Sequence, residues 1–99
     1  MYKDNLTDIK ILIVEDEKNI SNAEKKYLEI EGFTVEQAFD GQEAIEMINK
    51  IDYSLIILDL MLPKISGEKV MEIIRSKTDV PVIMVTAKID ESEILEGLK

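Results

Sequence analysis

Polar side chains able to do chemistry stand directly after each of three short apolar runs in this sequence. Glu15 and Asp16 follow the run at 11–14, Asp59 follows the run at 55–58, and Thr86 follows the run at 82–85. Three carboxylates gathered at neutral pH repel one another, and a bound hard cation relieves that repulsion. Mg²⁺ suits such a set because it prefers oxygen ligands and keeps several waters. One of the carboxylates could then act as a nucleophile toward a phosphoryl group and form an acyl phosphate.

Each of these residues also has an ordinary explanation when it is taken alone. Glu15 and Asp16 would suit the positive end of a following helix. Asp59 could be a turn residue, since Asp is common after strands, and Thr86 could simply end a β-rich segment. The functional interpretation rests on their coincidence, because all of them fall where a strand is expected to end.

The three apolar runs, together with the segment 34–38 whose Val35 is expected to face inward, predict the strands that must position these side chains. Short unbroken runs of Ile, Leu, Val and Met are typical of strands that are buried on both faces of a parallel sheet. Pro81 precedes the last run, and proline is tolerated at the first position of a strand. The expected strands are 11–14, 34–38, 55–58 and 82–85.

Segments between the strands carry apolar residues at helical spacing, with polar residues between them. Gly32 is expected to end the first helix, and Asp40 and Ser66 are expected to cap the start of the second and third. A fourth helix is expected at 90–99. The expected apolar stripes are Ile20, Ala23, Tyr27, Leu28 and Ile30; Ala44, Ile45 and Ile48; Val70, Met71, Ile73 and Ile74; and Ile94, Leu95 and Leu98.

This alternation of strands and helices predicts an α/β fold with a doubly wound parallel sheet. Crossovers between parallel strands are right-handed, which leaves few possible topologies. In such folds ligands bind outside the carboxyl ends of the strands, where the strand order reverses. The residues singled out above fall at those ends.

Composition excludes several other kinds of site. The chain has 99 residues with no Cys and no His, so it offers no disulfide, thiolate or imidazole ligand and no Ser-His-Asp triad. Its net charge of −9 disfavours binding to nucleic acid or to an anionic membrane. The longest apolar runs are too short to span a bilayer, and the first residues do not resemble a signal peptide. We therefore expect a cytoplasmic protein.

Three segments together resemble the receiver domain of two-component response regulators. They are ILIVEDE at 11–17, LIILDLMLPKISG at 55–67 and PVIMVTA at 81–87. Their order and spacing match the family, and the resemblance covers nearly the whole chain. It implies a flavodoxin-like fold with the strand order 2-1-3-4 for the four strands present here.

The resemblance also implies roles for particular residues. Asp59 would accept a phosphoryl group from a sensor histidine kinase. Glu15, Asp16 and Asp59 would hold Mg²⁺ together with the backbone carbonyl of Met61. Many relatives have Asp at both of the first two positions, so the longer Glu15 is expected to act through water.

Two further residues take their roles from the same resemblance. The hydroxyl of Thr86 would turn toward the phosphoryl oxygens after phosphorylation, and the backbone amide of Ala87 would face them. The protein would be a phosphoacceptor that assists its own phosphorylation and dephosphorylation, and not an enzyme in the ordinary sense. Its output domain would be a DNA-binding transcription regulator of the winged-helix type.

The sequence also departs from the family pattern. A receiver has a fifth strand, ending in a lysine that contacts the phosphoryl group, and a fifth helix, and residues 1–99 include neither. The domain is therefore expected to be an incomplete receiver. The strand at 82–85 would then be an apolar edge, which favours self-association or the swapping of an element between copies.

Two alternative functions remain open on the sequence. One is a receiver-like module that accepts no phosphoryl group and acts only through protein contacts, which the missing lysine suggests. The other is a Mg²⁺-dependent phosphohydrolase with an aspartyl-phosphate intermediate. Such enzymes carry a second Asp two residues after the nucleophile, whereas this chain has Met61 there.

Overall fold

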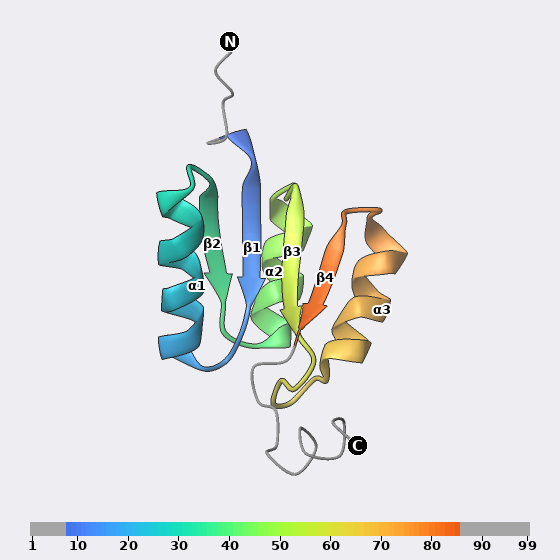
Figure 1. Cartoon of the computed structure of the whole chain (residues 1–99). Helices are drawn as coiled ribbons and strands as arrows, with labels where there is room; N and C mark the ends of the chain where they lie inside the picture. Colours follow the sequence, from blue (N-terminus) through green and yellow to red (C-terminus); the bar gives the residue numbers. More distant parts are fainter. Residues whose placement is uncertain (1–7, 86–99) are drawn as a thin grey trace, which may run out of the picture.

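Strands and helices alternate along the chain, as the sequence predicts (Figure 1). The computed structural model describes residues 8–85. The helix expected at 90–99 and the residues Thr86 and Ala87 lie outside that range. The elements are β1 (Lys10–Val14), α1 (Lys18–Ile30), β2 (Thr34–Ala38), α2 (Gly41–Lys50), β3 (Leu55–Asp59), α3 (Gly67–Lys77) and β4 (Val82–Val85).

The four strands form one parallel sheet in the order β2-β1-β3-β4. This order confirms the predicted flavodoxin-like topology. β1 lies between β2 and β3, and its Ile13 pairs with Gln37 on one side and Ile57 on the other. β2 is added to the sheet on one side of β1, and β3 and β4 are added on the other side. The strand order therefore reverses between β1 and β3, and the carboxyl ends of these two strands form the switch point where such folds bind ligands.

The two faces of the sheet are covered differently. Because side chains alternate along a strand, each strand contributes to both faces. α2 and α3 cover one face, where the main core lies. α1 covers the other, where the core is smaller. The main core comprises Leu12, Val14, Ala38, Ala44, Tyr53, Ile56, Leu58, Val70 and Ile74, and the smaller one comprises Ile11, Ile13 and Val35.

The predicted helix boundaries at Gly32, Asp40 and Ser66 are confirmed by their hydrogen bonds. Asp40 accepts from the backbone N–H of Glu43 at 2.8 Å, and Ser66 accepts from that of Lys69 at 3.2 Å. Gly32 has a φ of 108°, and the amides after α1 fold back onto its last carbonyls, as in a Schellman motif. None of the helices in residues 8–85 has the length and apolar character needed to cross a bilayer.

Two expectations about the core are wrong. The apolar stripe predicted for α1 was expected to face the sheet, but Tyr27 and Ile30 are 66% and 73% exposed and only Leu28 of the second half packs on the smaller core. The cause is geometric: both residues lie to the side of the line through Leu28 along which α1 contacts the sheet. Met84, which belongs to an apolar run of the kind expected to be buried on both faces, is 37% exposed because it lies on β4, at an edge of the described sheet.

Candidate functional site

Three carboxylates meet at the carboxyl ends of β1 and β3. Glu15 and Asp16 follow β1, and Asp59 ends β3, which is the neighbour of β1 in the sheet. One oxygen of each carboxylate lies within 4.8 Å of the others. Glu15 is 2% exposed and Asp59 is 1% exposed, whereas Asp16 is half-buried. The topology therefore brings together the acidic residues that the sequence singles out.

The Glu15 carboxylate is held by the backbone at the start of α1. Its Oε2 accepts a hydrogen bond from the N–H of Glu17 at 2.9 Å, and its own N–H donates to the Ala38 carbonyl at 3.1 Å. Glu17 is the residue that caps α1, so Glu15 supplies a negative charge where the helix dipole favours one. Glu15 thus does suit the positive end of the following helix, and its carboxylate is also part of the cluster.

Asp59 is positioned by the loop that follows β3. Its Oδ1 accepts from the N–H of Met61 at 3.0 Å, which turns the chain tightly around the carboxylate. The loop then folds back, and the N–H of Gly67 donates to the Leu60 carbonyl at 3.2 Å. A Cβ at Gly67 would lie 2.5 Å from the Asp59 carbonyl oxygen, so only glycine allows this close approach.

The donor set fits a hard divalent cation such as Mg²⁺. Carboxylate oxygens are the ligands that Mg²⁺ prefers, and three of them on largely buried residues form a concentrated negative site. Met61 lies beside the cluster because its amide binds Asp59. β4 ends at Val85, which pairs with Asp59, so the last residue that the structure describes lies beside the same cluster.

Glu24 is a fourth acidic residue near the site, and the sequence analysis did not identify it. It lies on α1 four residues from both Ile20 and Leu28, on the stripe that faces the sheet. Its Oε1 is shielded from solvent and has no hydrogen-bond partner among the described residues. Burial raises the pKa of Glu24, and the negative charge of Asp59 raises it further. The available signal was a charged residue at a helical spacing otherwise occupied by apolar ones.

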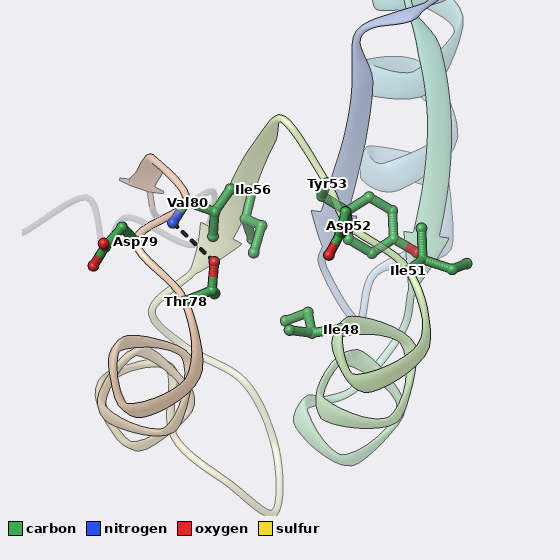
Figure 2. Close-up of a pocket in the computed structure, with 8 residues that line it drawn as sticks. All are labelled: Ile48, Ile51, Asp52, Tyr53, Ile56, Thr78, Asp79 and Val80. Carbon is green, nitrogen blue, oxygen red and sulfur yellow. Dashed lines mark hydrogen bonds between the residues drawn. The ribbon is translucent and has the colours of Figure 1, made fainter.

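A separate pocket of about 220 Å³ lies at the opposite end of the strands from the acidic cluster, where β3 and β4 begin (Figure 2). Within it, Thr78 Oγ1 accepts from the N–H of Val80 at 3.2 Å. Tyr53 donates to Glu36 Oε1 at 2.6 Å, and burial, together with that carboxylate, raises the tyrosine pKa well above its ordinary value. The pocket is lined by Ile48, Ile51, Asp52, Tyr53, Ile56, Thr78, Asp79 and Val80. None of the three cluster carboxylates lines this pocket, so it is distinct from the candidate metal site.

Comparison with known proteins agrees with this geometry. The model of the response regulator receiver domain family matches residues 11–99. The transcriptional regulatory protein SrrA of Staphylococcus aureus is 43% identical over 90 residues, which is 91% of this chain and 37% of SrrA. The uncharacterized transcriptional regulatory protein YcbL of Bacillus subtilis is 41% identical over 87 residues, which is 88% of this chain and 38% of YcbL. The chain therefore spans less than two fifths of these relatives.

Solved structures show the same fold. TrrA of Thermotoga maritima, in complex with Mg²⁺ and BeF, has a TM-score of 0.72 at 29% identity, and the match covers 91% of this chain and 96% of that one. TrrA in complex with the histidine kinase ThkA has a TM-score of 0.77 at 38% identity, covering 83% and 72%. Given the family match over 11–99, the 2-1-3-4 sheet and the acidic cluster at its switch point, this chain belongs to the response regulator receiver domain family.

Proposed function

We propose that Asp59 accepts a phosphoryl group from a histidine kinase, with Mg²⁺ held by Glu15, Asp16, Asp59 and the backbone carbonyl of Met61. The observation that carries this proposal is the meeting of the three carboxylates within 4.8 Å at the carboxyl ends of β1 and β3. The complex of the related TrrA with a histidine kinase supports the choice of donor, and its Mg²⁺–BeF complex supports the choice of metal.

The transfer needs one nucleophilic oxygen and a way to offset charge. A carboxylate oxygen of Asp59 attacks phosphorus as the P–N bond of a phosphohistidine breaks, which leaves an acyl phosphate on Asp59 and an imidazole on the kinase. A divalent cation at the cluster would offset the negative charges of the carboxylates and of the incoming phosphoryl group. The Met61 N–H holds Asp59 Oδ1, which fixes the orientation of the carboxylate.

Residues that follow β4 in the sequence respond to phosphorylation in this proposal. Thr86 contributes a hydroxyl and Ala87 a backbone amide to the phosphoryl oxygens, and the rearrangement is passed to an output that regulates transcription. The curated relatives SrrA and YcbL are transcriptional regulatory proteins, which supports that output for the whole protein. The domain itself acts as a phosphoacceptor and does not turn over a substrate.

The decisive experiment is an intact-mass measurement after incubation with a small-molecule phosphodonor, with and without Mg²⁺. We expect a single labile phosphoryl addition that requires Mg²⁺, that Asp59→Asn abolishes and that Asp16→Asn strongly reduces. Asp79→Asn is the matched control, because it removes an exposed carboxylate at the end of the sheet where β3 and β4 begin, far from the cluster. Addition that persists in Asp59→Asn would contradict the proposal.

An alternative function is a protein-interaction module that accepts no phosphoryl group. The exposed side chains of β4 favour it, since Ile83 is 50% exposed on a strand that has one neighbour within the described sheet. Edge strands of this kind recruit further strands, and we propose that isolated chains self-associate or exchange elements through β4. Sedimentation of the purified chain tests this, and a compact monomer at all concentrations would contradict it. Failure of phosphoryl addition together with stable self-association would favour the alternative.

A further inference from the structure

The pocket where β3 and β4 begin lies between α2 and α3, so its walls are complete within residues 8–85 (Figure 2). One wall is the end of α2 with the residues that lead into β3, and the other is the segment that joins α3 to β4. The two helices approach closely at their amino ends, where a Cβ at Gly41 would lie 2.6 Å from Val70 Cγ2. At their carboxyl ends a cavity of about 220 Å³ separates them.

Both walls of the pocket are held in place by hydrogen bonds. On the α3 side, Arg75 donates to the Thr78 carbonyl at 3.1 Å and to the Val80 carbonyl at 2.6 Å, and Thr78 Oγ1 accepts from the Val80 N–H. On the α2 side, Tyr53 is buried and its hydroxyl is bound to Glu36. A ligand would therefore meet a preformed cavity, and its binding would order little of the chain.

The size and interior of the pocket define the apolar part of a ligand. An apolar protein cavity of about 150 Å³ holds a benzene molecule. The volume of about 220 Å³ therefore has room for one six-membered ring and a short chain. Ile48, Ile56 and Val80 give the cavity apolar surface. A ring buried against these side chains would gain the hydrophobic free energy of the area removed from water.

The charges that line the pocket favour a cation. Asp52 and Asp79 are the charged residues of the lining, and both are acidic. In Figure 2 the Asp52 side chain is directed toward the pocket interior, whereas the Asp79 side chain is directed away from it. Ile51 and Thr78, which end α2 and α3, also line the pocket. The carboxyl end of a helix carries a partial negative charge, so both helix ends add to the attraction for a cation.

The last turns of the two helices also carry basic residues, which stay out of the lining. Arg75 is bound to the carbonyls on the α3 side, and Lys50 and Lys77 are exposed. They weaken the attraction for a cation at long range, but Asp52 remains the charged group directed into the cavity.

We propose that this pocket binds a small amphipathic amine, with its apolar body between Ile48, Ile56 and Val80 and its ammonium group at the Asp52 carboxylate. The apolar contacts hold the body of the ligand, and the ion pair selects its charge. The pocket is separate from the acidic cluster, so this inference does not depend on phosphoryl transfer at Asp59.

Two molecules of the same shape test the proposal on the purified 99-residue chain. 2-Phenylethylamine and 2-phenylethanol share a ring and an ethyl chain, and only the amine is charged at neutral pH. Each is titrated into nitrogen-15-labelled protein, and its affinity is read by NMR from the amides of residues 78–80. We expect the amine to bind about fivefold more tightly, which is the range of a partly exposed ion pair.

Variants then locate the binding site. Asp52→Asn is expected to abolish the preference for the amine, whereas Glu72→Gln leaves it unchanged, because it removes the same charge from an exposed position of α3 outside the lining. Ile48→Phe places a ring inside the pocket and is expected to weaken both molecules at least fivefold. Ile45→Phe is its control, since it makes the same change on α2 outside the lining.

Equal affinity of the wild-type chain for the two molecules would overturn the inference, and so would a preference for the amine that survives in Asp52→Asn. Amide shifts confined to Glu15, Asp16 and Asp59 would place the cation at the acidic cluster and would contradict it equally. The same conclusion would follow if neither molecule shifted the amides of residues 78–80 in a chain whose spectrum shows it to be folded.

Discussion

The two faces of the sheet differ in how completely they are closed. The face under α2 and α3 holds nine buried core residues, including Leu58 and Val70. Within residues 8–85, the face under α1 holds three, and beside them lie Glu24 and the half-exposed Ile83. Since buried apolar area is the main source of folding free energy, the closed face stabilises the domain. Within residues 8–85, the face under α1 leaves more apolar surface exposed, as at Ile83. The acidic cluster lies at the carboxyl ends of β1 and β3, which contribute side chains to both faces.

The largest difference is expected from adjacent residues of β3 that point to opposite faces. Leu58 is fully buried under α2 and α3, so Leu58→Ala should lower the free energy of unfolding by about 3 kcal/mol through lost burial and a cavity. Ile57 is half-buried on the face under α1, so Ile57→Ala should cost only about 1 kcal/mol. Urea unfolding measures both, and equal costs would show that the open face is closed in solution.

Gly67→Ala is expected to be the next largest change, and its effect falls on the site. The new Cβ would meet the Asp59 carbonyl oxygen at 2.5 Å and the Leu60 Cα at 2.6 Å, both backbone atoms that cannot turn aside. We expect a loss of about 2 kcal/mol and a displaced Asp59. Phosphoryl addition at a temperature where the variant stays folded should therefore be slower, and an unchanged rate would show that the loop adapts elsewhere.

The helix caps give a smaller contrast. Asp40 caps α2 through a 2.8 Å hydrogen bond, whereas α1 begins at Glu17 with no side-chain cap. Asp40→Ala should therefore cost about 1 kcal/mol. Glu17→Ala should cost far less, and thermal unfolding of the two variants compares them. A large loss in Glu17→Ala would point to an effect on the neighbouring Glu15.

Glu24→Gln is expected to have the smallest effect, and it should be a gain of roughly 0.5 kcal/mol at neutral pH. The folded chain holds the Glu24 proton more tightly than the unfolded chain, because burial and Asp59 raise its pKa above 4.5. Glu24 therefore costs stability progressively as the pH rises from about 4.5 through the raised pKa. Unfolding at about pH 4 and about pH 7 should show the gain only at the higher pH. A gain that is the same at both would contradict this assignment.

Much of the fold could be predicted from local patterns. Runs such as Ile11–Val14 are too apolar for an exposed strand, and Gly32, Asp40 and Ser66 are residues whose backbone or side chain ends a helix in a defined way. Met84 was predicted wrongly because an apolar run does not tell that its strand lies at an edge of the described sheet. Tyr27 and Ile30 were predicted wrongly because helical spacing identifies an apolar stripe but does not tell which neighbour covers it. Glu24 was missed for the same reason.

The sequence by itself determined which residues could form the site and that they follow strands. It also determined the family, since the motifs at 11–17, 55–67 and 81–87 match in order and spacing. Only the tertiary structure decided that β1 and β3 are neighbours, which brings Glu15, Asp16 and Asp59 within 4.8 Å. It also decided that one face of the described sheet is closed and the other open. These are properties of strand order and helix placement, and they depend on contacts between residues far apart in the chain, which local spacing does not encode.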